Sequence, residues 1–177
     1  AEIFLNRLYI LQPLAQAYAR TRDMKYANAW FQILDHWRQS NPYGMQDPLG
    51  KMWNDMQMSW RLVAMIYGIY LMGEDDTLTK EQWQTVYDMI RQHAAVMLPE
   101  LAEDIEKKNM SNHVTLKAMA LTLAGILLPE LCDAAATMET VRDYLAIQIK
   151  QKYYPDGTSR EMGHTYRFFT TRLYLEI

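Results

Sequence analysis

Two short segments of the chain combine residue types that could carry out chemistry. The first, residues 109–113 (NMSNH), lies directly before an apolar stretch. The second, residues 153–167, holds two Arg, a His, a Glu, an Asp and three Tyr within 15 residues. The start of a helix offers free N–H groups and a positive dipole end to anions, and His and Tyr can transfer protons. These segments therefore form a candidate site for an anionic ligand.

Helices must position these segments, because apolar residues recur every three or four positions along most of the chain. We expect helices at residues 3–21 (kinked at Pro13), 24–39, 56–72, 80–97 (with a Thr79/Gln82 capping box), 114–128, 137–152 and from 161 onward, with a short helix beginning at Pro99. An irregular loop should span residues 41–55. The expected fold class is all-α, with about seven helices paired as antiparallel hairpins, in one domain over residues 1–177.

Composition excludes several classes of protein. Half of the 177 residues are hydrophobic and the net charge is −3, which is typical of a globular domain. A single cysteine, Cys132, cannot form an intrachain disulfide framework or a Cys-based zinc site. The longest apolar run, residues 62–72, is too short to cross a membrane. No spacing of His or carboxylates fits a metal site, so we predict neither a metal nor a cofactor.

Both ends of the sequence lie within apolar helical patterns, so we expect a fragment of a larger protein. The apolar residues near the two ends are Ile3, Phe4, Leu5, Phe168, Phe169, Leu173 and Leu175. A helical array without terminal caps exposes such residues, and large apolar patches usually find a partner. We therefore expect the isolated fragment to self-associate and to have little or no activity.

The Asn112-His113 pair and the segment PDGTSREMGHTY at residues 155–166 resemble the heparinase II/III type of polysaccharide lyase, and alginate and oligoalginate lyases of the same build. Residues 15–42, with AQAY, a short turn and a Tyr–Trp helix ending at NP, are also similar to that family. The resemblance implies an α/α toroid followed by a β-sandwich domain. No part of this chain resembles the sandwich, so the resemblance implies a partial α/α toroid.

The resemblance also implies roles for three residues. Asn112 and His113 would neutralise a substrate carboxylate, with His113 a possible base, and Tyr166 would be the catalytic tyrosine. The chain departs from the family pattern at Gly163 and Arg167, where Ser and His are usual. Alternatively, Asn112 is the N-cap of the next helix with His113 packed at its first turn, and Tyr166 is a buried aromatic residue.

Other residues are weaker candidates for substrate binding. Arg61 interrupts an apolar helix and, if buried, must be paired, either with a carboxylate such as Glu161 or with a substrate carboxylate. Glu161 is expected to position other groups. Three aromatic residues in or beside loops suit sugar stacking: Trp53, Tyr153 and Tyr154. Arg160 belongs to a basic stretch. His36 and His164 have weaker claims. We expect His93 to be solvated, because it lies on a charged helix.

These observations favour a polysaccharide lyase that cleaves a uronic-acid-containing polymer, similar to heparin, heparan sulfate or alginate, by β-elimination. Tyr166 or His113 would be the base and Tyr166 the acid. Residues 150–172 carry five basic and two acidic residues, a local excess that can attract a polyanion but is small for nucleic-acid binding. We expect no nucleic-acid or membrane partner and a periplasmic or secreted location. One alternative is a glycoside hydrolase using Asp156 and Glu161, with Asp55 as another candidate carboxylate. The other is a non-catalytic carbohydrate-binding helical module.

Overall fold

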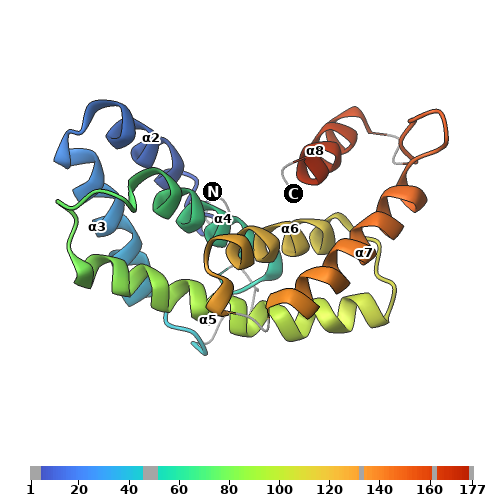
Figure 1. Cartoon of the computed structure of the whole chain (residues 1–177), viewed down its shortest axis with the longest axis horizontal. Coiled ribbons are helices and arrows are strands. Elements are labelled where there is room, and N and C mark those ends of the chain that lie inside the picture. Colours follow the sequence, from blue (N-terminus) through green and yellow to red (C-terminus); the bar gives the residue numbers. More distant parts are fainter. Residues whose placement is uncertain (1–4, 46–51, 132–133, 161–162, 176–177) are drawn as a thin grey trace. The chain divides into compact units, whose positions relative to one another are not determined.

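The described part of the chain is entirely helical apart from loops and one isolated β-bridge. A computed structural model describes residues 5–45, 52–131, 134–160 and 163–175, without the side chains of residues 134–137, 164 and 166. Its elements, in chain order, are α2 (Leu11–Thr21), α3 (Met24–Ser40), α4 (Asp55–Met72), α5 (Lys80–Glu106), α6 (Asn112–Leu127), the 3₁₀ helix η1 (Pro129–Leu131), α7 (Ala134–Lys152) and α8 (His164–Leu175) (Figure 1). The described residues thus form seven α-helices, as the sequence predicts.

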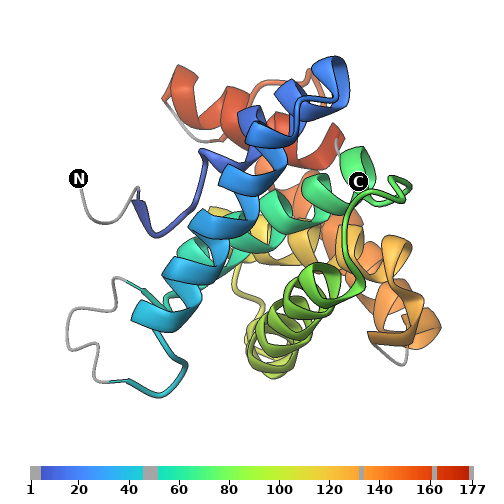
Figure 2. The ribbon, with the colours of Figure 1, turned by 90° about the vertical axis from the view of Figure 1, so that its left-hand side faces the viewer.

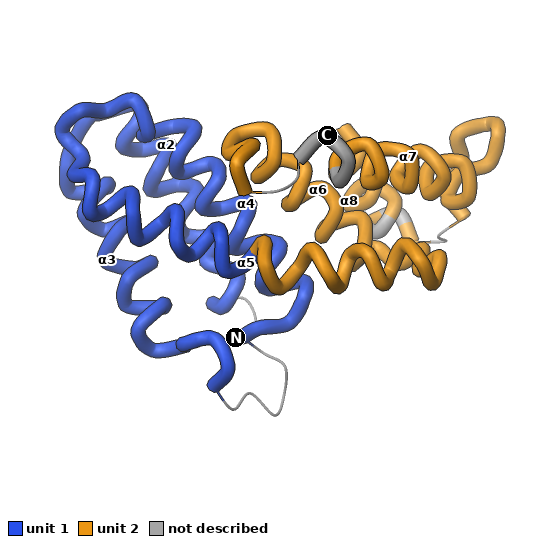
Figure 3. Tube along the Cα trace, turned by 60° about the horizontal axis from the view of Figure 1, so that its bottom comes forward, with its two compact units in different colours: residues 1–93 blue, residues 94–177 orange. Residues whose placement is uncertain are grey.

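The chain divides into two compact units, residues 1–93 and 94–177 (Figure 3). The boundary falls within α5. The first unit contains α2, α3 and α4, and the second contains α6, α7 and α8. Both segments singled out from the sequence, 109–113 and 153–167, belong to the second unit. The expectation of a single domain over residues 1–177 stays a prediction.

In the first unit, α2 and α3 form a helical hairpin that the sequence predicts, and α2 also packs against α4 (Figures 1 and 2). The turn is tight because Arg22 adopts a left-handed conformation at the end of α2, while the side chain of Asp23 accepts the backbone N–H of Lys25. Asn54 caps α4 in the same way through Met56 N–H. These caps satisfy donors that a helix start leaves free.

The core of the first unit is built around a fully buried indole. Trp30 packs edge-on against Phe31, with ring centroids 4.9 Å apart, and lies 6.3 Å from the ring of Trp83. Helix α4 approaches this indole at Gly68, where an added Cβ would lie 2.3 Å from Cζ2 of Trp30. Only a residue without a side chain fits there, which explains a glycine in the middle of a buried helix.

Two predictions about prolines are wrong. Residues 6–10 form turns, and α2 begins only at Leu11, which puts Pro13 in its first turn rather than at a kink. A first-turn residue has no intrahelical acceptor for its N–H, so proline fits. The two helices expected at 80–97 and from Pro99 are one helix, α5, with Pro99 inside it. Pro99 and Ala95 are both exposed, so water can reach the carbonyl that proline leaves unpaired.

The start of α5 agrees with the sequence. The side chain of Gln82 accepts the backbone N–H of Thr79 at 2.8 Å, and Thr79 Oγ1 accepts the N–H of Gln82 at 3.3 Å. This reciprocal pair is the expected capping box, in which two donors at the helix start are satisfied by side chains.

Helix α6 lies at the centre of the second unit, where it packs against α7, α8 and η1. Ten of its residues are buried, in agreement with its apolar sequence. Helix α7 presents one buried stripe, which runs from Val141 through Leu145 and Gln148 to Lys152. The last two members of that stripe are polar, and they lie where α7 meets the start of α6.

The apolar residues near the chain ends differ in exposure. Leu5, Phe168 and Leu175 are exposed, at 71%, 74% and 81%, whereas Leu173 is buried. Ile3 and Phe4 lie outside the described residues. Self-association of the chain stays a prediction.

Candidate active site

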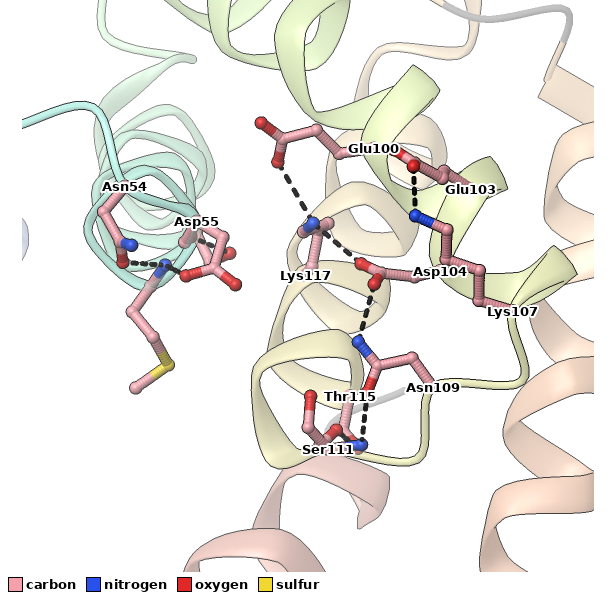
Figure 4. Close-up of polar contacts among 12 residues, drawn as sticks. Asn54, Asp55, Glu100, Glu103, Asp104, Lys107, Asn109, Ser111, Thr115 and Lys117 are labelled. Atoms are coloured by element: carbon pink, nitrogen blue, oxygen red, sulfur yellow. Dashed lines mark hydrogen bonds and ion pairs between the residues drawn. The ribbon is translucent and has the colours of Figure 1, made fainter. Parts of the chain in front are cut away.

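A network of polar contacts fixes the loop that leads into α6. The ammonium of Lys117, whose side chain is 4% exposed, forms ion pairs with Glu100 at 3.0 Å and with Asp104 at 2.9 Å (Figure 4). Asp104 also accepts from the amide of Asn109 at 2.7 Å, and Asn109 Oδ1 accepts the N–H of Ser111 at 3.2 Å. Burial alone would lower the pKa of Lys117, but the two carboxylates outweigh it and raise that pKa. Asp104 of α5 therefore holds both the loop, through Asn109, and helix α6, through the buried and charged Lys117.

Asn112 follows this loop as the first residue of α6. The N-cap is Ser111, so the alternative that Asn112 caps the helix is wrong. The Asn112 side chain is half-buried, and its Oδ1 accepts from Lys152 Nζ at 2.9 Å and from Thr170 Oγ1 at 3.1 Å. Because Lys can only donate hydrogen bonds, these contacts fix the amide with its oxygen toward Lys152 and Thr170. His113 is exposed beside it.

The second motif begins with a compact turn at the end of α7. Tyr153 pairs with Ser159 in an antiparallel bridge, and Arg160 N–H donates to the carbonyl of Lys152 at 2.8 Å. The reversal needs Gly157, which has a φ of +80°, a conformation that glycine adopts without strain. Residues 159 and 160 are thus held beside the end of α7.

Two candidate binding residues lie on this turn. Tyr154 is 47% exposed, and the guanidinium of Arg160 lies 4.5 Å from the centroid of its ring. The carboxylate of Asp156 accepts the N–H of Thr158 at 2.9 Å, and this backbone hydrogen bond is the main cause that lowers the pKa of Asp156. An exposed aromatic ring beside a cation suits a sugar bearing a negative charge.

Tyr166 lies in the first turn of α8, four residues before Thr170. Its side chain, and Glu161, lie outside the described residues. Positions four apart share a face of a helix, and Thr170 is 3% exposed and contacts Asn112. The helices carrying Asn112 and Tyr166 are therefore in contact. That Asn112, His113 and Tyr166 converge on one surface stays a prediction.

Arg61 is fully buried within the first unit. Its Nη1 donates to the carbonyl of Asn6 at 2.6 Å, its Nε donates to His93 at 3.0 Å, and its guanidinium lies 4.1 Å from the ring centroid of Trp37. Among the described residues no carboxylate contacts it, and Nη2 has no hydrogen-bond partner. Burial lowers the pKa of Arg61 to about 9, which leaves it charged at neutral pH. Its expected pairing with Glu161 or with a substrate carboxylate stays a prediction.

The prediction that His93 is solvated is wrong, because His93 is fully buried. Its Nε2 accepts from Arg61, which can only donate, so the proton is on Nδ1, which contacts the carbonyl of Met89 at 2.8 Å. Burial, followed by the nearby Arg61 charge, lowers the pKa of His93 to about 3. His93 is therefore a neutral acceptor that helps to hold Arg61.

Trp53 is half-buried, and its indole N–H donates to the carbonyl of Asn41 at 3.2 Å. Its ring packs near those of Trp37 and Tyr43, with centroids 5.7 and 5.0 Å away. These three aromatic residues line a surface pocket of about 400 Å³ in the first unit. The pocket is compatible with the predicted sugar stacking, which stays a prediction.

The structure thus brings together α6 and α8, the two helices that carry Asn112 and Tyr166. It also adds two residues to the site that the sequence motifs do not mark as candidates. Lys152 and Thr170 both donate to Asn112. The sequence does carry a signal for Lys152, because Lys152 continues the three- and four-residue spacing of Val141, Leu145 and Gln148 along α7. Thr170 carried no comparable signal, since a single threonine on a helix is ordinary.

No group of three or more His, Cys, Asp or Glu in the described parts of the chain could hold a metal ion. Within the same described residues, no helix combines the length and apolar character needed to span a membrane.

Comparison with known proteins relates the whole arrangement to one family. A curated heparin-sulfate lyase from Bacteroides thetaiotaomicron is 25% identical over 162 residues, which are 92% of this chain and 22% of that protein. The crystal structure of a mutant of the heparan sulfate lyase HepC from Pedobacter heparinus matches with a TM-score of 0.76 at 25% identity, over 97% of this chain and 26% of that one. The crystal structure of heparinase III matches with a TM-score of 0.79 at 24% identity, over 97% of this chain and 25% of that one.

The chain therefore spans about a quarter of the length of these relatives. The structural match confirms the expected fold class, an all-α portion of an α/α toroid. The model of the heparinase II/III N-terminus family matches residues 2–177. This chain belongs to the heparinase II/III N-terminus family.

Proposed function

We propose that this chain is the helical part of a polysaccharide lyase that cleaves a uronic-acid-containing polymer by β-elimination. Its relatives are described as lyases of heparin sulfate or heparan sulfate, so a polymer of this type is the first candidate substrate. An alginate-like polymer, which the sequence motifs also suggest, is the second.

Elimination has three chemical requirements. The uronate carboxylate must be neutralised so that negative charge can develop beside C5, a base must remove the C5 proton, and an acid must protonate the leaving glycosidic oxygen. Asn112 is proposed for the first task, with His113 beside it. Tyr166 is proposed as the acid, and Tyr166 or His113 as the base.

The hydrogen bonds of the Asn112 amide are the main support for this proposal. Its Oδ1 is occupied by two donors, Lys152 and Thr170, so the NH₂ group is the part of the amide that can donate to a carboxylate. The second donor belongs to α8, one turn after Tyr166. A carboxylate held by Asn112 would then lie close to the helix that carries the proposed acid.

A hydrolase is less well supported. Hydrolysis needs one carboxyl group that stays protonated, and that group requires a raised pKa. The pKa of Asp156 is instead lowered, and its carboxylate serves the turn by accepting from Thr158. Asp156 is therefore a poor general acid.

An assay on the complete protein tests the proposal. Incubation with heparan sulfate, heparin or alginate should produce an unsaturated uronide with its characteristic ultraviolet absorbance. New reducing ends without that absorbance would indicate hydrolysis. Binding without cleavage would indicate a non-catalytic module. Either result would reject the lyase proposal.

A further inference from the structure

The start of α6 is bound by a lysine from the end of α7. Lys152 is 7% exposed, and its Nζ donates to Asn112 Oδ1 at 2.9 Å and to Thr115 Oγ1 at 3.1 Å. Both acceptors belong to the first turn of α6. A buried ammonium is costly unless polar groups surround it, so its placement against this particular turn requires an explanation.

The neighbouring polar groups hold Lys152 in place. Thr115 Oγ1 donates to Gln148 Oε1 at 2.8 Å, which leaves the Thr115 oxygen facing the ammonium as an acceptor. Tyr174 of α8 also donates to Gln148 Oε1, at 3.1 Å. The ammonium is thus set by contacts from α6, α7 and α8 rather than by a flexible surface position.

The charge on Lys152 acts on the Asn112 amide in two ways. It fixes the amide orientation, because an ammonium can bond only to the oxygen. A charge-assisted bond to that oxygen also draws electron density toward it, which makes the opposite N–H groups stronger donors. Both effects favour donation from Asn112 Nδ2 to an anion.

We propose that Lys152 is a positioning residue that orients and polarises Asn112 for the uronate carboxylate. The inference rests on the proposed function, because it assigns Lys152 a role in binding the same substrate group. Negative charge on that carboxylate increases as the C5 proton leaves, so a polarised donor stabilises the transition state more than the ground state. Lys152 therefore contributes mainly to kcat.

Steady-state kinetics of the complete protein test this role. Lys152→Met should lower kcat about 10- to 100-fold, with a smaller change in KM, because a charge-assisted hydrogen bond is lost. Lys152→Arg should restore part of the loss, since it keeps a cationic donor. Arg142→Met, which removes an exposed cation from the same helix, is the matched control and should leave the kinetics unchanged.

A double-mutant cycle separates positioning from general stability. In an Asn112→Ala background, Lys152→Met should change kcat less than about 3-fold, because the residue through which Lys152 acts is gone. Thr170→Val, which removes the second donor to the same oxygen without removing a charge, should likewise lose its effect in that background. If Lys152→Met does not fold, the same double-mutant cycle is measured with Lys152→Arg and with Thr170→Val, each combined with Asn112→Ala.

The outcomes distinguish the two proposals. Normal activity of a folded Asn112→Ala variant would overturn the role of Asn112 in the proposed function. Loss of activity in Asn112→Ala together with normal kcat in Lys152→Met, or with fully additive effects in the double variant, would overturn the role of Lys152 alone.

Discussion

Oδ1 of Asn112 lies 3.1 Å from the hydroxyl of Thr170, a residue 58 positions later in the chain. The contact joins the first turn of α6 to α8, and Tyr166 lies one turn before Thr170 in the same helix. Two motifs that are far apart in the sequence are therefore carried by helices in direct contact. This relationship supports the proposed division of labour between an amide that binds a carboxylate and a tyrosine that transfers a proton.

The packing of α4 on Trp30 makes a prediction for stability. Gly68→Ala would place a Cβ 2.3 Å from the buried indole. We expect the free energy of unfolding to fall by about 1–3 kcal/mol, because overpacking outweighs the helix-propensity gain of alanine. Urea denaturation followed by circular dichroism measures the change.

Gly125→Ala is the matched control, because Gly125 also lies inside a buried helix but its added Cβ would face the flexible end of Met138 at 3.1 Å. It should be close to neutral or stabilising. Equal losses in the two variants would show that the approach to Trp30 is not the cause.

His93 makes the stability of the first unit depend on pH. Its folded-state pKa is about 3, below the ordinary value of 6.5, so the unfolded chain binds the proton more readily. The free energy of unfolding is therefore at its full value above pH 6.5, where the imidazole is neutral in both states. It decreases as the pH falls from 6.5 toward 3, by up to about 1.4 kcal/mol per pH unit. Denaturation at a series of pH values measures this slope.

His93→Gln keeps an acceptor for Arg61 but cannot titrate. In this variant the free energy of unfolding should therefore depend less on pH, by the contribution of His93. His36→Gln, which replaces an exposed histidine, is the control. An unchanged slope in His93→Gln would mean that His93 is not the group responsible.

The anchor of the loop before α6 can be weakened selectively. Asp104→Asn removes one of the two carboxylates that face the buried Lys117. We expect a loss of about 1–3 kcal/mol, because the remaining partner, Glu100, compensates only in part. Chemical denaturation provides the measurement.

The neighbouring Glu103 pairs with Lys107 at an exposed position, so Glu103→Gln should change stability very little. If the two variants behave alike, the buried ion pair between Lys117 and Asp104 does not stabilise the fold.

Most helices could be predicted because they depend on local spacing of apolar residues. The structure differs from the predicted helices at two prolines, because proline is compatible with more than one local structure. Pro13 fits a first turn as well as a kink, and Pro99 is tolerated inside α5 on an exposed face. A single sequence does not specify which outcome tertiary packing selects.

The site could be predicted only in part. Asn112, His113 and Tyr166 were identified from their resemblance to family motifs, whereas Lys152 and Thr170 depend on contacts between helices. The charged composition of its helix predicts a solvated His93. The three- and four-residue spacing that links it to Val86, Ile90 and Met97 instead places it on the buried face of α5. Periodicity was the better guide there, because burial follows the face of a helix and not its average charge.

The central claim, that Tyr166 transfers a proton during β-elimination, is tested most directly by Tyr166→Phe in the complete protein. The assay follows formation of the unsaturated uronide from heparan sulfate, with the thermal unfolding midpoint measured in parallel. The account predicts a fall in kcat of about 10²–10⁴-fold, because one hydroxyl and its proton transfer are lost, with little change in stability. Near-normal turnover in the folded variant would contradict the account.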